Sequence, residues 1–400
     1  MINRITRFFA GMPGNLGRIT SGSGFIPEID GLRFLAIVPV VLMHFSERLV
    51  RVDPEHIGAR EQQVAHIFDN GHIGVYLFFA ISGFILALPF AAHKLLHKPV
   101  PLKKYYLRRL TRLEPPYILI MSLLFVTLVV IKHEDIQALF PHFLASMVYI
   151  HRFIYGTWTP INPPSWTLEI EVQFYVVAPF LALLYFSIGK KWLRRGIMIA
   201  ALIGKIFLDN LTTVVDPTYQ TLPFVVQFFL VGILMADIFL TEWRQGIRQH
   251  RVFDWITLIS LIVLFCTWTW GKDLSWKFFF LAALFSTFYS SFRSMAINRF
   301  LRNPWVTAIG GMCYTIYLLH LAFAEFFVMI WHRLLPGMSY SVSMVLGLIV
   351  FLPALFVTSS IFFVLIEKPC MDPQWPKKLR EWAVGLLGKN RQAEREPTDH

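Results

Sequence analysis

Long apolar runs separated by short polar segments recur from residue 30 to residue 366 of this 400-residue chain. A helix that crosses the hydrocarbon core of a bilayer needs about 20 mostly apolar residues. The runs predict spans near 31–46, 72–92, 115–131, 166–187, 196–208, 219–240, 253–270, 275–291, 305–331 and 340–366. The pattern therefore predicts an all-α polytopic membrane protein with about ten transmembrane helices.

Residues 138–154 form a less regular apolar run that contains Pro141, His142, His151 and Arg152. Lys and Arg are enriched in the cytoplasmic loops of membrane proteins. With ten spans and a cytoplasmic N-terminus, most Lys and Arg residues fall on the cytoplasmic side, whereas an eleventh span at 138–154 would put the majority outside. The charges favour ten spans, cytoplasmic N- and C-termini, and an outer-side re-entrant or interfacial segment near 138–154.

The composition supports this reading and explains the net charge. The chain is 56% hydrophobic and only 16% charged, whereas soluble domains carry about 25% charged residues. Because the net charge of +12 follows the topology, we expect no nucleic-acid partner. The three cysteines, Cys266, Cys313 and Cys370, have no disulfide or metal-ligand spacing, and we expect no metal site.

Polarity divides the chain into a cytoplasmic N-terminal segment (1–30), a transmembrane domain (31–367) and a cytoplasmic polar tail (368–400). Residues 1–24 contain three arginines but no continuous apolar run. We therefore expect no cleaved signal peptide.

Arg33 and His44 both lie in the first apolar run, eleven residues apart. Eleven residues make about three helical turns, so both side chains fall on one face, about 16 Å apart along the axis. Ionisable residues are costly inside a membrane. The pair therefore indicates function.

Further polar residues sort into two layers under the predicted orientation. The inner layer contains Arg33, Arg109, Arg112 and Glu367, and the outer half contains His44, His72, Glu169, Glu171 and His320. The inner cations can simply anchor a cytoplasmic loop. Arg109 and Arg112, three residues apart at the mouth of a span, also suit a phosphate-bearing ligand.

Glu169 and Glu171 open the fourth predicted span, beside Trp166 and Tyr175. The helix dipole favours an acid in the first turn, which accounts for one carboxylate but not for two on different faces. In the second predicted span, Ser82 and Gly83 are two consecutive residues with small side chains. They permit either close approach of another helix or passage of a thin acyl-pantetheine arm.

Six segments together resemble the acyltransferase 3 family of bacterial integral-membrane O-acyltransferases, in family order from residue 28 to residue 370. They are Asp30-Gly31-Leu32-Arg33 with His44, Phe79-Ala80-Ile81-Ser82-Gly83-Phe84, Arg109-Leu110-Thr111-Arg112, Ser165-Trp166-Thr167-Leu168-Glu169-Ile170-Glu171, Tyr317-Leu318-Leu319-His320 and Glu367-Lys368-Pro369. The chain departs from the family pattern at Glu114 and at Cys313, where a serine often stands.

The resemblance implies acyl transfer across the bilayer of a bacterial cytoplasmic (inner) membrane, by a domain spanning 31–367. The donor would be cytoplasmic acyl-CoA, preferentially acetyl-CoA, acting as a substrate, with no tightly bound cofactor. The acceptor would be a hydroxyl of an extracytoplasmic carbohydrate such as O-antigen, exopolysaccharide or another cell-envelope glycan. We expect no hydrolase-like domain after the last span, so transfer to such a domain would need a separate protein.

Within this scheme His44 would act as general base, because imidazole titrates near neutral pH. Arg33 would hold the CoA end or stabilise charge, and Arg109 with Arg112 would bind its phosphates. Either Glu169 or Glu171 would orient His44 or bind the acceptor. Further substrate or pocket residues would be Ser82, Gly83, Trp166, Tyr175, His72 and His320.

The residues leave open which glutamate supports His44, whether transfer is direct or passes through an acyl-enzyme, and the oligomeric state. The alternative function is a transporter or exporter of a glycan or lipid-linked intermediate. Such transporters usually contain repeat-related halves with interrupted helices at matching places, and the sequence shows no internal repeat.

Overall fold

The computed structural model describes residues 13–14, 16–19, 24–54, 57–211, 221–267, 273–372 and 374–375. Within these ranges every regular element is helical. The helices are α2 (Pro27–Val52), α3 (Ala59–Asp69), η2 (Asn70–His72), α4 (Ile73–Leu96), α5 (Leu102–Val130), α6 (Ile136–Met147), α7 (His151–Tyr155), η3 (Pro163–Ser165), α8 (Trp166–Ser187), α9 (Lys191–Leu211), α10 (Leu222–Thr241), α11 (Val252–Thr267), α12 (Leu274–Arg293), α13 (Ala296–Leu301), α14 (Pro304–Gly311), α15 (Cys313–Leu334), α16 (Tyr340–Phe362), η4 (Phe363–Glu367) and α17 (Lys368–Cys370). The predicted all-α class is confirmed.

Seven of the helical segments in these ranges are long and apolar enough to cross a membrane. They are α2, α3 with α4, α5, η3 with α8, α10, α15, and α16 with η4 and α17. The other predicted spans correspond to α9, α11 and α12. The apolar helix α11 has only 16 residues, and α9 begins with the cations Lys191, Arg194 and Arg195. The chain is therefore a multi-pass membrane protein, and the count of ten stays a prediction.

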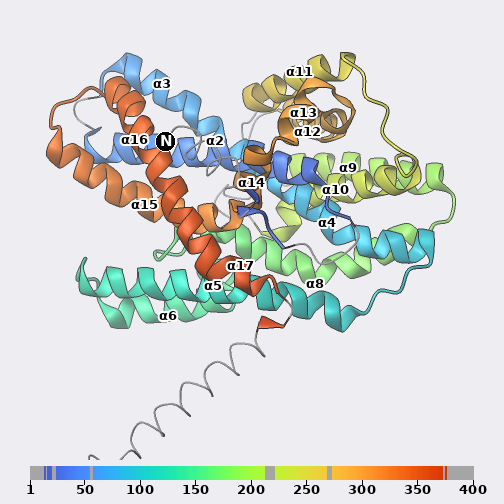
Figure 1. Cartoon of the computed structure of the whole chain (residues 1–400), viewed down its shortest axis with the longest axis horizontal. Coiled ribbons are helices and arrows are strands. Elements are labelled where there is room, and N and C mark those ends of the chain that lie inside the picture. The colour runs from blue at the N-terminus through green and yellow to red at the C-terminus, as the bar shows by residue number, and fades with distance from the viewer. Residues whose placement is uncertain are drawn as a thin grey trace, which may run out of the picture.

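The segment near 138–154 folds as two short helices. The helix α6 has 12 residues and α7 has 5, and Tyr149 between them has a φ of 57°. A 12-residue helix is about 18 Å long, shorter than a hydrocarbon core of about 30 Å. In Figure 1 the helix α6 lies beside α5. The fold agrees with a segment that does not cross, while its side of the membrane stays a prediction.

Helix α2 lies at the centre of the bundle and packs on α4, α14, α15 and α16. Glycines on its neighbours permit close contact: a Cβ at Gly74 of α4 would overlap the Ala36 carbonyl, and a Cβ at Gly310 of α14 would overlap the Asp30 carbonyl. The helix continues through Pro39. Arg33 and His44 therefore lie on a single helix, as predicted.

The helices α4 and α10 also pack closely against each other. A Cβ at Gly83 would overlap the backbone of Phe229, and a Cβ at Gly232 would overlap that of Ala80 and Phe84. Small residues let two helix backbones approach in a membrane, where packing drives association. The space beside Gly83 is thus filled by α10. This is the packing role that the sequence left as one alternative to a ligand passage.

A buried ion network joins α9 to α10. The Asp237 carboxylate is fully buried and accepts hydrogen bonds from Arg194 Nε at 3.0 Å, Arg195 Nε at 3.1 Å and the Tyr185 hydroxyl at 3.0 Å. Arg195 also pairs with Glu242. Since a buried charge is costly without partners, this network fixes how the two helices join.

The predicted domain boundaries are not tested by the fold. Most of the N-terminal segment 1–30 and of the polar tail 368–400 lies outside the described residues.

Candidate active site

His44 on α2 is paired with an acid on its own helix. Its Nδ1 lies 2.8 Å from Oε2 of Glu47, three residues further along. A carboxylate partner favours the tautomer that carries hydrogen on Nδ1, which leaves Nε2 as a proton acceptor. Within the described part of the chain no hydrogen bond joins His44 to Glu169 or Glu171.

Glu47 belongs to a chain of charges at this end of the molecule. Oε1 of Glu47 lies 3.4 Å from NH2 of Arg48, a buried side chain. NH1 of Arg48 pairs at 3.1 Å with Glu325 of α15, which also pairs at 3.3 Å with Lys132. These ion pairs fix the C-terminal part of α2 against α15 and hold the carboxylate beside His44.

Two further histidines lie near His44. The ring of His320, from α15, lies 5.1 Å from the His44 ring between centroids. His320 is fully buried and its Nδ1 lies 2.7 Å from the carbonyl oxygen of Tyr317, to which it donates. Its Nε2 is buried and has no hydrogen-bond partner among the described residues. His72 interacts electrostatically with His44 and Glu47. The structure therefore brings these three predicted histidines together.

The two glutamates of α8 have different partners. Glu169 is buried and its carboxylate accepts hydrogen bonds at 3.1 Å from the backbone N–H of Arg152, in the first turn of α7. A carboxylate at this position caps the N-terminus of α7 and interacts favourably with the helix dipole. Oε1 of Glu171 accepts 2.7 Å hydrogen bonds from the hydroxyls of Ser82 and Tyr175. Glu169 thus anchors α7, and Glu171 joins α4 to α8.

Glu171 also links the middle of the bundle to the arginines. It interacts electrostatically with Arg33 and with Arg109. The Arg109 guanidinium lies 4.0 Å from the centre of the Tyr105 ring and 5.7 Å from that of Tyr175. Arg109 and Glu171 therefore belong to one partly buried polar group.

Trp166, also predicted from the sequence, lies apart from this group. Its ring packs 5.5 Å from the guanidinium of Arg152 and 6.4 Å from the ring of Phe79. It therefore supports the turn between α7 and α8, and no contact joins it to His44 within the described ranges.

At the opposite end of α2, Asp30 bridges two cations. Its buried carboxylate accepts a 2.8 Å hydrogen bond from Arg33 and a 2.9 Å hydrogen bond from Arg18. Nearby, Arg112 NH2 lies 3.5 Å from the fully buried Glu367, which also accepts a 2.6 Å hydrogen bond from Thr315. The predicted inner residues Arg33, Arg112 and Glu367 thus form one charged end.

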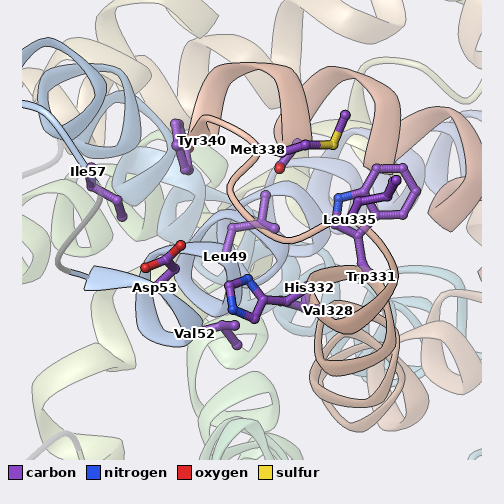
Figure 2. A pocket seen from close by; sticks show the side chains of 11 residues that line it. Leu49, Val52, Asp53, Ile57, Val328, Trp331, His332, Leu335, Met338 and Tyr340 are labelled. Atoms are coloured by element: carbon purple, nitrogen blue, oxygen red, sulfur yellow. The ribbon is translucent and has the colours of Figure 1, made fainter.

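A small cavity lies at the His44 end, between the end of α2 and the α15–α16 loop (Figure 2). Its lining includes Leu49, Asp53, Trp331, His332 and Tyr340, and its volume is about 30 Å³. A cavity of this volume holds about one or two water molecules and not a sugar ring. Among the described residues, no cluster of three or more His, Cys, Asp or Glu side chains is arranged to bind a metal ion.

The sequence missed Glu47 and the contacts that hold α15 against α8. The signal for Glu47 was its position three residues after His44, where side chains on a helix are neighbours. The Tyr317 hydroxyl lies 2.6 Å from that of Thr167 and also hydrogen-bonds the Pro164 carbonyl. No local sequence pattern predicts this contact, because Thr167 and Tyr317 are 150 residues apart in the sequence.

Comparison with known proteins identifies the family. The family model of the acyltransferase 3 domain matches residues 26–367. A Staphylococcus aureus (strain COL) protein that bears the name of an O-acetyltransferase is 24% identical over 334 residues, which cover 76% of this chain and 51% of the relative. The peptidoglycan O-acetyltransferase OatA of Listeria monocytogenes (strain EGD-e) is 25% identical over 181 residues, covering 43% of this chain and 26% of that protein.

This chain thus spans about half the length of the first of these relatives and about a quarter of the second. No solved structure matches it. The family model covers most of the sequence, including the whole of α2. The chain therefore belongs to the acyltransferase 3 family.

Proposed function

We propose that this protein transfers an acyl group, preferentially acetyl, from acyl-CoA in the cytoplasm to a hydroxyl of a carbohydrate outside the membrane. The observation that carries the proposal is the arrangement along α2. One end holds a histidine paired with a carboxylate, and the other end holds a cluster of arginines. In this scheme the arginine end receives the anionic CoA donor, and the histidine end supplies the base for the acceptor.

The chemistry requires a base for the acceptor hydroxyl. As the hydroxyl oxygen attacks the carbonyl carbon of the thioester, His44 Nε2 takes its proton. The carbon–sulfur bond then breaks, and the proton passes from His44 to the CoA thiolate. General-base assistance of this kind typically contributes 10²–10⁴-fold. Glu47 holds the imidazole in the required tautomer and stabilises its protonated form, and His44 serves equally in a direct or a two-step transfer.

His320 completes the acceptor side of the proposal. Because its Nδ1 donates to a backbone carbonyl, its buried Nε2 presents an unused lone pair beside His44. A buried acceptor without a partner is costly, and a second hydroxyl of the acceptor sugar, distinct from the one that gives its proton to His44, can satisfy it. His320 therefore positions the acceptor sugar for His44.

Relatives support the class of acceptor. One of them carries the name peptidoglycan O-acetyltransferase, and we propose a cell-envelope glycan as the acceptor here. The donor end is the end with Arg33, Arg109 and Arg112, which faces the cytoplasm of a bacterial inner membrane in this scheme, with both termini on that side. The Arg109 guanidinium lies near two tyrosine rings and donates to the Tyr105 carbonyl at 3.4 Å, and its other N–H groups would bind a phosphate or thioester oxygen.

The proposal is tested by acetylation of surface glycans in cells. Mass spectrometry is expected to show loss of one acetylation in a deletion strain, recovery with the wild-type gene, and no recovery with His44→Ala at equal membrane abundance. Near-wild-type acetylation by His44→Ala would refute the assignment. Glu134→Gln, an exposed acid beyond the end of α5, is the matched control and is expected to restore acetylation.

A second measurement separates an enzyme from a transporter. Purified protein is titrated with acetyl-CoA, and saturable binding that free acetate does not compete away is expected. Absence of binding at millimolar acetyl-CoA would favour export of a glycan or lipid-linked intermediate instead.

A further inference from the structure

An open cavity lies at the arginine-rich end of the molecule, outside the site described above. It is lined by Gln249, Met295, Asn298, Arg299, Arg302, Asn303 and Pro304, and its volume is about 500 Å³. Binding sites for small molecules usually measure about 300–1,000 Å³. Five of the seven lining residues are polar, with two guanidinium groups and three amides, and none of the seven is an acid. Its size and chemistry therefore suit a polar organic anion.

The two arginines are available for a ligand. Arg299 is exposed and its side chain has no ion pair or hydrogen bond among the described residues. Arg302 is 56% exposed and forms one long ion pair, with its Nε 3.7 Å from Oε1 of Glu28. By contrast, Asn298 is buried and fixed: it donates to the Ser291 carbonyl at 3.2 Å and accepts from Gln249 at 2.8 Å. The cavity thus has a rigid wall, the exposed Arg299, and an exposed Arg302 that shares one long ion pair with Glu28.

The cavity adjoins the start of α2. A Cβ at Gly31 would overlap Leu301, so α13 packs directly against the first turns of α2. Asn298 also donates a 3.4 Å hydrogen bond to Glu28, two residues before the carboxylate that binds Arg33. The nearby acids are already engaged, since Asp254 accepts from the backbone N–H groups of Ala296 and Ile297. A ligand in the cavity would lie beside the Arg33 end of α2.

We propose that this cavity binds phosphate groups, with Arg299 and Arg302 as the contacting cations. Guanidinium forks match phosphate oxygens in geometry as well as charge. Two sources share this chemistry. One is the 3′-phospho-ADP end of an acyl-CoA donor, a form that rests on the proposed function. The other is the headgroup of an anionic phospholipid, which does not depend on it.

The test compares the wild type and two variants of the full chain in nanodiscs of phosphatidylcholine. Arg299→Ala/Arg302→Ala removes both contacting cations. Arg251→Ala removes an exposed cation from the neighbouring loop, outside the cavity, and is the matched control. All three are first melted without ligand to verify that they are folded. Then 3′,5′-ADP is titrated, and in a second arm the shift in melting temperature on replacing part of the lipid with phosphatidylglycerol is measured.

If the nucleotide is the ligand, the double variant is expected to raise the Kd of 3′,5′-ADP about tenfold or more, with Arg251→Ala unchanged. If the ligand is a lipid headgroup, the double variant instead loses the stabilisation by phosphatidylglycerol while nucleotide binding is equal in all variants. Either result supports the phosphate cavity. Equal responses of the wild type and the double variant in both arms would overturn it. In that case Arg299 and Arg302 would only help to set the orientation of the chain in the membrane and would not bind phosphate.

The same protein separates this inference from the proposed function. If the wild type transfers acetyl groups and the double variant has an unchanged KM for acetyl-CoA and an unchanged lipid response, the cavity is refuted and the function stands. If the wild type binds no acetyl-CoA, the proposed function and the nucleotide form fail together, and the lipid arm decides the cavity.

Discussion

Glu47 offers the sharpest test of how His44 is activated. Its Oε2 lies 2.8 Å from His44 Nδ1, and its side chain is 49% exposed. A hydrogen bond to a charged group contributes about 1.5–3 kcal/mol, and solvent screening of a half-exposed pair reduces this toward the lower end. We therefore expect Glu47→Ala to lower kcat roughly tenfold, with KM for the donor unchanged. Glu47→Gln keeps an acceptor oxygen without the charge, so its loss is expected to be smaller.

The assay is acetyl transfer by purified protein in nanodiscs, read as kcat and KM for acetyl-CoA. His44→Ala is expected to lose about 10²–10⁴-fold. A positioning residue acts only through the group that it positions, so adding Glu47→Ala to His44→Ala should cause no further loss. Losses that multiply in the double variant, or a Glu47→Ala protein with wild-type kcat, would refute the role. Glu134→Gln provides the control for loss of an acid.

Three further results follow from buried or paired charges. Arg109→Ala is expected to raise the apparent dissociation constant for acetyl-CoA roughly 10- to 150-fold in a titration, with partial recovery in Arg109→Lys. An unaltered dissociation constant in folded protein would contradict phosphate binding by Arg109. Asp237→Asn leaves two guanidinium groups without their shared carboxylate, and we expect a loss of about 3–5 kcal/mol in unfolding free energy, checked by a fall in melting temperature; unchanged melting would show that the network is not stabilising. Burial lowers the pKa of His151, in the short helix α7, from 6.5 to about 4. The unfolded chain therefore binds a proton that the fold excludes, so stability is full above pH 6.5 and falls as the pH drops toward 4. Melting temperatures should show a flatter acid dependence in His151→Gln, and equal slopes would contradict this.

The long helices of the fold were predictable because each one corresponds to an apolar run between two polar segments of the sequence. The joint position of Arg33 and His44 was predictable for the same reason, since both lie on α2. The break at Met312, which divides the predicted span 305–331 into α14 and α15, was not predicted. Its local signal is the pair Gly310-Gly311, of a kind that often marks a turn, and Gly310 lies where α14 packs closely on the start of α2.

Partners across the bundle were less accessible to sequence reasoning. An acid at the start of a helix has a local explanation in the dipole of that helix, and Glu169 satisfies this description. Its actual contacts are the backbone amides of Arg152 and Phe153 in the helix before. Whether a carboxylate serves its own helix or a neighbouring one depends on tertiary packing, which spacing alone does not reveal.

The short motifs acquire a common physical role once their partners are known. A charge inside an apolar bundle is tolerated only with a partner, and the motifs supply partners to one another over long separations. Arg112 pairs with Glu367 across 255 residues, and Ser82 donates to Glu171 across 89. His44 lies beside His320, from the fifth motif. Other partners are local, since Asp30 pairs with Arg33 and Glu47 with His44 on the same helix. Substituting Arg112 should therefore disturb Glu367 in a distant motif, whereas substituting His44 should disturb Glu47 three residues away.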